Sequence, residues 1–411
     1  MRLALTRRTV AFALLVAVVL AAAPAFAQHT RQETDGIRFG AFSIHPSLLT
    51  AFRYNDNVYF VANDYRPEDE RSIPQGIESD FVLNVVPAIF FDVSVPTFQF
   101  RTGYRFYNDN YMGYDDPDNR HDDLNASNHT FSGLLDYNAP FGLMIGASDN
   151  YTIMETYEET DQFVNYLKGN QIHNDARGWF GFRYGMYDNI YLKATYIHLL
   201  DQFETYEEFD KSSQYIDGEL RLKFFPRTAV VAQGGYGIVD YDQIQAFDST
   251  NWFAMGGLQG QITSHLLMTA KGGWQMADYQ EGDDFAGWLA QGELTALFLG
   301  NTQWSFGYRR FFRDGANTNY YTSHEGYSRF SRLWGSRLNT DAYLSYQYND
   351  FSAPNDRHED FIQASLEISY RFVYWLYVGG GYRLGHRLYD DNEIEETATR
   401  NTISVNLQAV F

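Results

Sequence analysis

Arginine and lysine recur at every second position along several stretches of the sequence, opposite runs of apolar side chains. In the stretch 98–107, Arg101 and Arg105 share one parity, whereas Phe98, Phe100 and Tyr104 take the other. Guanidinium groups hold carboxylates and phosphates through paired hydrogen bonds, so a row of them offers sites for anions. The spacing therefore predicts anion binding along one face of extended chain segments.

We name the cations on this parity the lumen cations, because we expect them to face a water-filled interior. They are Arg101, Arg105, Arg183, Lys193, Arg221, Lys223, Lys271, Arg309, Arg313, Arg371, Arg383 and Arg387. The acids found on the same parity are fewer, namely Asp217, Glu219, Glu293, Asp341 and Glu367. Rings of Arg or Lys favour anions in a pore. The alternative is that these residues form cross-strand Arg–Glu ladders, which stiffen any water-filled barrel.

Patterns for other chemistry are scarce. The triplet His121-Asp122-Asp123 has no serine or second carboxylate pair that the sequence places opposite it, although distant residues can meet in a fold. The chain has no cysteine, and no segment has metal-ligand or nucleotide-binding spacing. We therefore expect no enzyme, no catalytic residue, no metal or cofactor and no nucleic-acid partner.

The segments that carry the lumen cations read as strands. The last stretch, 402–411, alternates apolar and polar residues to a terminal Phe411. The stretches 216–224 and 361–372 alternate in the same way. Aromatic residues make up 18% of the chain, as suits the two interfacial girdles of a membrane barrel.

Short turns connect these strands in pairs. They are predicted at 94–96, 140–142, 187–189, 226–228, 264–265, 299–301, 335–337 and 373–375. Longer polar loops are predicted at 60–77, 113–126, 157–172, 204–211, 241–250, 280–285, 314–326, 349–359 and 388–399. Together they predict an all-β, transmembrane, antiparallel up-and-down β-barrel of about eighteen strands, with sixteen as the alternative. A soluble β-sandwich is the competing fold.

The amino-terminal segment reads as a secretory signal peptide. Arg2, Arg7 and Arg8 precede an apolar run, and Ala25-Phe26-Ala27 forms a small-x-small cleavage site. A membrane anchor is the alternative, although the run is shorter than a spanning helix requires. We expect a signal peptide at 1–27, a periplasmic arm at 28–38 and the barrel at 39–411, in the outer membrane of a Gram-negative bacterium. Barrel-assembly machinery is then an expected partner, with Leu407, Ala409 and Phe411 as the membrane-insertion signal.

The net charge of −21 is concentrated in the predicted loops. Acidic clusters include Glu68-Asp69-Glu70, Asp115-Asp116 and Asp283-Asp284. A solvated outer surface explains them. Divalent cations shared with the phosphates of lipopolysaccharide are the alternative, because oxygen ligands suit calcium and magnesium. Outer-membrane lipid is an expected partner under either interpretation.

A motif near the amino terminus resembles a known group. Tyr54, Asp56, Asn57 and Val58 open the motif, and Pro87 lies in the return strand. This sequence is similar to the group of outer-membrane barrels called β-barrel porin 2, over about the first hundred residues. Members of that group accompany exopolysaccharide or capsule loci, including polymerase-dependent (Wzx/Wzy-type) secretion. The strand count and arginine-rich interior also resemble alginate-exporter barrels, without a motif match.

The resemblance implies a conduit that secretes an acidic exopolysaccharide, guided passively by a cationic lumen. An anionic polysaccharide and a separate periplasmic polysaccharide-export protein would then be partners. A general or anion-preferring diffusion porin is the first alternative. A surface structural or adhesion barrel, in which the acidic loops do the work, is the second.

Overall fold

The computed structural model describes most of the chain after the predicted signal peptide. The described residues are 36–58, 60, 78–113, 125–155, 157–159, 166–168, 170–185, 189–204, 207–243, 247–298, 301–314, 319–352, 357–390 and 395–411. His121-Asp122-Asp123, the signal peptide, most of the predicted arm and most of the acidic loop clusters lie outside them. None of the helices in the described part is long and apolar enough to cross a membrane.

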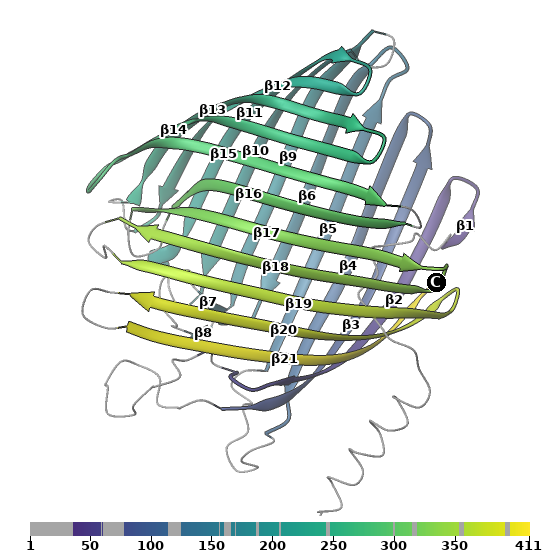
Figure 1. The fold of residues 1–411 in the computed structure, drawn as a ribbon. Coiled ribbons are helices and arrows are strands. Elements are labelled where there is room, and N and C mark those ends of the chain that lie inside the picture. The colour runs from purple at the N-terminus through teal and green to yellow at the C-terminus, as the bar shows by residue number, and fades with distance from the viewer. Residues whose placement is uncertain are drawn as a thin grey trace, which may run out of the picture.

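Long antiparallel strands form one closed barrel (Figure 1). They belong to a sheet of 19 strands, of which the short β1 (Ile37–Phe39) lies outside the barrel, leaving eighteen in the wall. The barrel strands are β2 (Phe42–Asn55), β3 (Asp80–Val95), β4 (Phe98–Tyr111), β5 (Ala126–Asn138), β6 (Leu143–Met154), β9 (Gln171–Tyr184), β10 (Ile190–Phe203), β11 (Lys211–Phe225), β12 (Thr228–Tyr241), β13 (Ser249–Thr263), β14 (Leu266–Tyr279), β15 (Phe285–Phe298), β16 (Thr302–Asp314), β17 (Tyr320–Trp334), β18 (Leu338–Phe351), β19 (His358–Val373), β20 (Leu376–Asp390) and β21 (Glu395–Val410). The predicted fold class is confirmed.

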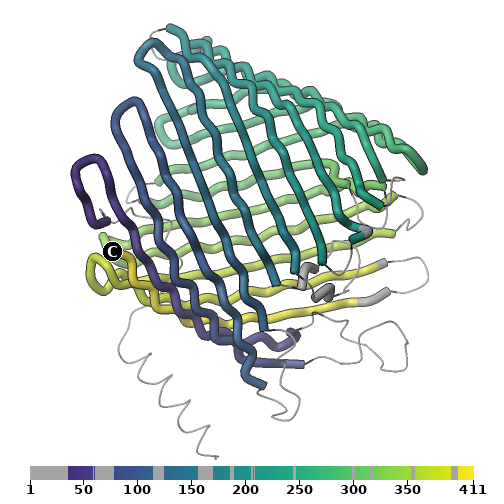
Figure 2. The backbone as a smooth tube through the Cα atoms, turned by 180° about the vertical axis from the view of Figure 1, so that it is seen from behind, coloured from purple at the N-terminus to yellow at the C-terminus, as the bar shows by residue number. Residues whose placement is uncertain are grey.

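The first and last barrel strands close the wall. The strands β2 and β21 pair from Ser47 opposite Val410 to Asn55 opposite Thr402, and they lie side by side in the view from behind (Figure 2). Closure leaves no unpaired sheet edge, which is the condition for a sheet to cross lipid. The strand β1 pairs with the start of β2. Residues 37 and 38, predicted as part of a separate arm, are therefore hydrogen-bonded to the sheet.

The described residues of the predicted short turns lie at one end of the barrel, at or between strand ends; residues 187–188 and 299–300 lie outside the described part. Figure 1 shows this end at the right and upper right, and the opposite strand ends at the left and bottom; we call the two ends the short-turn end and the loop end. Several loop predictions were wrong in part. Within the predicted loop 388–399, β20 continues to Asp390 and β21 begins at Glu395. The strand β17 begins at Tyr320, inside the predicted loop 314–326. The predicted loop 157–172 contains the hairpin β7 (Tyr157–Glu159) and β8 (Tyr166–Lys168) as well as the start of β9.

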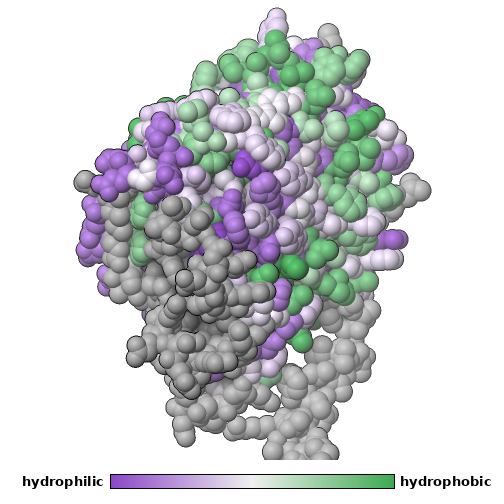
Figure 3. All heavy atoms as spheres, turned by 60° about the vertical axis from the view of Figure 1, so that its left-hand side comes forward, coloured by the Kyte–Doolittle hydropathy of each residue, from purple (hydrophilic) through white to green (hydrophobic). Residues whose placement is uncertain are grey.

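The outer face of the wall is apolar. Ile216, Leu222, Leu366 and Leu407 are exposed to between 41% and 60%, all on the parity opposite the lumen cations. Large aromatic side chains gather toward the strand ends, with Tyr374 exposed to 78%. In Figure 3, hydrophobic side chains occupy the upper and right-hand parts of the wall, with hydrophilic ones between them. Such a surface would aggregate in water, whereas lipid covers it.

One strand pair departs from regular pairing. The strands β15 and β16 pair only from Ala290 opposite Arg310 to Phe298 opposite Thr302. Toward the loop end, the rings of Phe285 and Phe312 lie 4.5 Å apart. The Arg310 guanidinium donates to the Trp288 carbonyl oxygen. Side-chain contacts thus connect β15 and β16 in this part of the wall, where backbone ladder pairing is absent.

Candidate functional site: the barrel lumen

The lumen cations lie on the inner face of the wall. The strand pairing keeps these alternate residues on the same face from one strand to the next. Tyr191, for example, pairs with both Arg183 and Arg221, and Ser365 pairs with Arg383. Their apolar neighbours in sequence are the exposed outer side chains. The structure therefore brings these cations to one interior, at different heights. Their anion-binding role stays a prediction.

Several lumen cations have carboxylate partners. Arg101 Nε lies 2.9 Å from Asp92, Arg383 is 3.0 Å from Glu367, and Arg309 is paired with Glu325. Asp92 and Glu325 were absent from the predicted acids, and Glu325 lies inside the predicted loop 314–326. At these positions the cross-strand ladder describes the wall better than a bare cationic surface.

A second group of lumen cations contacts neutral groups. Lys271 Nζ donates to Gln233 at 3.0 Å, and Arg371 donates to the Ser336 carbonyl oxygen at 2.6 Å. Lys193 lies 4.9 Å above the Trp179 ring, and Arg105 is 5.9 Å from the centre of the Phe90 ring. Cation–π contacts of this kind hold a charge in place without neutralising it.

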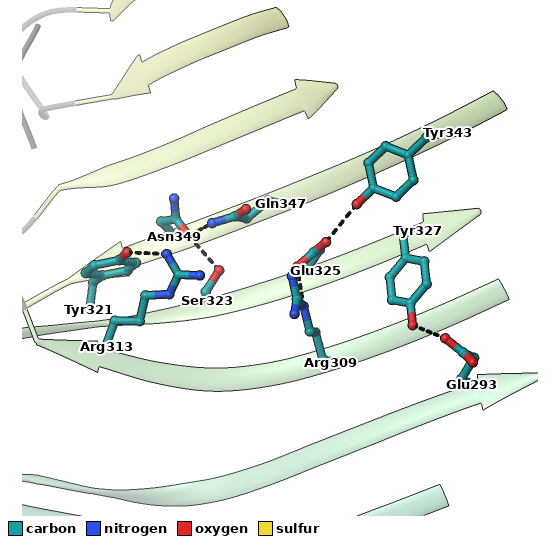
Figure 4. Close-up of polar contacts among 10 residues, drawn as sticks. All are labelled: Glu293, Arg309, Arg313, Tyr321, Ser323, Glu325, Tyr327, Tyr343, Gln347 and Asn349. Atoms are coloured by element: carbon teal, nitrogen blue, oxygen red, sulfur yellow. Dashed lines mark hydrogen bonds and ion pairs between the residues drawn. The ribbon is translucent and has the colours of Figure 1, made fainter. Parts of the chain in front are cut away.

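The middle of the wall carries a network of tyrosines and carboxylates (Figure 4). Tyr327 Oη donates to Glu293 at 2.5 Å, and Tyr343 Oη donates to Glu325 at 3.1 Å. Glu325, whose side chain is 5% exposed, also accepts from Arg309. These residues help to line a cavity of about 460 Å³. The two carboxylates offset the two arginines that line this cavity, Arg309 and Arg329, so the middle of this wall is polar without a surplus of positive charge.

A glycine positions the Tyr327 ring. The ring lies over Gly307 on β16, where an added Cβ would overlap it. Since glycine has no Cβ, the ring can approach the backbone of the neighbouring strand. The hydroxyl group is thereby directed at Glu293.

Arg309 and Arg313 flank one aromatic ring. Their guanidinium carbons lie 5.1 Å and 4.9 Å from the centre of the Phe311 ring. Arg313 also donates to Tyr321 Oη at 3.4 Å (Figure 4). In the same view, Ser323 and Gln347 donate to Asn349.

The residues of the amino-terminal motif join the first and last strands at the loop end. The Asp56 carboxylate accepts from the Asn401 backbone amide at 2.6 Å and from Asn401 Nδ2 at 2.7 Å. Asn57, only 1% exposed, donates from Nδ2 to the Thr399 carbonyl oxygen. Val58 N donates to Glu78 O. We call Asp56, Asn57 and Asn401 the seam clasp.

Two further motif residues support the same strands. The Tyr54 and Phe81 rings lie 5.1 Å apart on β2 and β3. Pro87 lies opposite Leu48, and the pairing of β3 with β4 skips Val86 and Pro87. Proline has no N–H to donate to a ladder, so this interruption follows from its chemistry.

Phe60 follows the clasp and lies inside the barrel. It is fully buried, with a φ of 52° that side chains rarely adopt. The guanidinium carbons of Arg400 and Arg387 lie 4.4 Å and 5.2 Å from the centre of its ring. Arg387 is also paired with Glu359 at 2.8 Å, and both side chains are nearly inaccessible. This cluster is packed into the wall at the seam.

The carboxyl terminus lies at the other end of the seam. Phe411 stacks on Trp375 with ring centres 5.4 Å apart, and its amide donates to the Pro46 carbonyl oxygen. Leu407 points outward and is 48% exposed, and Ala409 shares its parity opposite Leu48. The insertion signal assigned to these residues stays a prediction.

A basic pocket lies at the short-turn end. It has a volume of about 450 Å³ and is lined by Arg183, Tyr191, Arg221, Lys223, Pro226, Arg227, Thr228, Ala229 and Gln259. Arg183, Lys223 and Arg227 are exposed to solvent. Arg227 lies in the turn between β11 and β12 and was not among the predicted cations, because it belongs to the predicted turn 226–228.

Sequence reasoning missed other cations of the inner face: Arg53, Arg177, Lys211, Arg329 and Arg400. Arg53 is paired with Asp109 at 2.5 Å and Arg177 with Asp175 at 2.6 Å. All five follow the alternation of their strands, so a parity count over the full strand lengths would have found them. In the described part of the chain, no group of three or more acidic or histidine side chains could hold a metal ion.

Comparisons with known proteins yield fold likenesses only. No protein-family model and no curated protein matches the chain. Among solved structures, OccAB3 of Acinetobacter baumannii is 10% identical, with 91% of this chain and 100% of that one covered and a TM-score of 0.49. The outer membrane protein OpdK of Pseudomonas aeruginosa is 10% identical, with 90% and 99% covered and a TM-score of 0.47. The siderophore receptor PirA of Pseudomonas aeruginosa is 8% identical, with 89% and 80% covered and a TM-score of 0.43.

Proposed function

We propose that the protein is an outer-membrane channel through which small polar solutes diffuse. The observation that carries the proposal is the division of the wall: an apolar outer face fits lipid, and a charged inner face fits water. Cavities of about 430, 450 and 460 Å³ line that inner face. An eighteen-stranded barrel is wide enough for an aqueous interior.

The paired charges favour diffusion over guided polymer export. A cationic track for an acidic polysaccharide would need arginines whose charge is not already offset along the wall. Arg101, Arg309 and Arg383 each have a carboxylate partner instead. The exporter remains a second prediction, which rests on the motif resemblance.

The test is conductance of the purified full-length barrel in planar bilayers, together with swelling of liposomes in small sugars and amino acids. We expect stable conductance and solute-dependent swelling from the folded protein, and neither from a heat-unfolded sample of the same preparation. A folded barrel that gives neither signal would overturn the proposal. A deletion strain that loses surface polysaccharide while small-solute permeability is unchanged would favour the exporter.

A further inference from the structure

We propose that the basic pocket at the short-turn end is a binding site for small multivalent anions, such as tricarboxylates and phosphate esters. The inference rests on the proposed diffusion channel and assigns it a solute class. Arg183 on β9, Arg221 and Lys223 on β11, and Arg227 in the following turn line one cavity. No acidic residue is among its described lining residues. Several cations around one cavity suit a solute that carries several negative charges.

The Glu219 carboxylate, which is paired with a pocket arginine, is already shared. Glu219 accepts from Arg221 and, at 3.1 Å, from Gln233 Nε2. Gln233 in turn accepts from Lys271 at 3.0 Å. One negative charge therefore serves a network that holds two cations. The positive charges of Arg183, Lys223 and Arg227 add to it.

Two of the pocket arginines also contact neutral groups. Arg183 donates to the neutral amide oxygen of Asn138 at 3.4 Å. The Arg221 guanidinium carbon lies 4.9 Å from the centre of the Tyr191 ring. Arginine can bind carboxylate or phosphate oxygens in a bidentate manner, and Lys223 adds a compact charge. The pocket thus combines planar guanidinium donors with an exposed ammonium group.

Acidic residues are numerous at the loop end of the barrel, alongside cations such as Lys211 and Arg313. They include Asp201, Glu204, Asp210, Asp242, Asp248, Glu281, Asp283 and Asp284. Charges at the two ends are separated by the length of a strand, which exceeds the screening length of about 10 Å at 0.1 M salt. Each end therefore keeps its own local potential. A multivalent anion is repelled at the loop end and attracted at the short-turn end.

This arrangement predicts a response that depends on the side of addition. An anion added at the short-turn side reaches the pocket directly, whereas one added at the loop side must first pass the acidic end. Citrate or pyrophosphate should therefore block the ionic current at lower concentration from the short-turn side. The current through the channel should also differ between the two voltage polarities.

The experiment measures single-channel block by citrate, by pyrophosphate and by acetate as the monovalent control. The protein is full-length wild type, R227Q, K223Q/R227Q and the matched control R337Q. Arg337 is an exposed arginine in another short turn at the same end, outside the pocket. We expect the half-blocking concentration of citrate to rise about threefold in R227Q and about tenfold in K223Q/R227Q. The value in R337Q should match wild type, and acetate should block none of the proteins.

Three results would overturn the site: equal citrate block in wild type and K223Q/R227Q, equal loss of block in R337Q, or equal block by citrate and acetate. Citrate and pyrophosphate are compared because they separate carboxylate from phosphate preference. If the folded barrel conducts nothing, the diffusion channel fails. Titration calorimetry of the detergent-solubilised protein with citrate then still tests the pocket, through the loss of binding heat in K223Q/R227Q.

Discussion

The seam clasp should hold the barrel closed, and Asp56→Ala tests it. The substitution removes the acceptor of two hydrogen bonds from Asn401, at 2.6 and 2.7 Å. A hydrogen bond to a charged group contributes about 1.5–3 kcal/mol, and the carboxylate is half-buried, so we expect a loss of about 2–3 kcal/mol for the pair. The paired register of β2 and β21 ends at Asn55 opposite Thr402, so the clasp extends it.

The assay is urea unfolding of the barrel in lipid vesicles, followed by tryptophan fluorescence and by the mobility of unheated samples on gels. Asp56→Asn keeps the shape and one good acceptor, so its loss should be about half that of Asp56→Ala. Asn401→Ala keeps the backbone amide and removes only the Nδ2 bond to Asp56, and the double variant should lose less than the sum of the two single losses. An unchanged midpoint in a folded Asp56→Ala barrel, or full additivity with Asn401→Ala, would refute the clasp.

Two other substitutions test the wall. Gly307→Ala places a methyl group against the Tyr327 ring and should cost about 1–3 kcal/mol by the same urea assay; Gly292→Ala, where open space surrounds the new atom, is the control and should be neutral. Glu359→Gln removes a counter-charge from the nearly inaccessible Arg387 and should cost about 3 kcal/mol, whereas a Glu359→Gln and Arg387→Met pair should recover much of that loss. An unaltered unfolding midpoint in Gly307→Ala or Glu359→Gln would contradict the corresponding account.

The barrel could be predicted from sequence because its turns and alternation are local features. Pro140 and Gly142 mark one such turn, and the parity of 361–372 follows from the residues themselves. The strand prediction from alternation failed where both faces of a strand carry polar side chains, because such a strand resembles a loop in sequence. Ser323 and Glu325 lie in β17, yet the stretch around them reads as polar throughout.

The sites could be predicted only in part because they join distant residues. Asp56 and Asn401 are 345 positions apart, so the motif gave no indication that it fastens the seam. The basic pocket combines β9, β11 and a turn, and its charge depends on which carboxylates lie nearby. The alternation along a strand predicts which residues face the interior. It does not predict how far along the barrel axis a residue lies or which residue lies beside it, because both depend on how the strands pair.

The incomplete ladder between β15 and β16 has a mechanical consequence. The circumference of a closed barrel of hydrogen-bonded strands is set by the number of strands. At the loop end, β15 and β16 are held together by the Phe285 and Phe312 rings and by Arg310 rather than by ladder hydrogen bonds. Side-chain packing yields more readily than a ladder, so radial breathing of the wall should concentrate here. Amide deuterium uptake in 285–289 should accordingly precede that in 290–298.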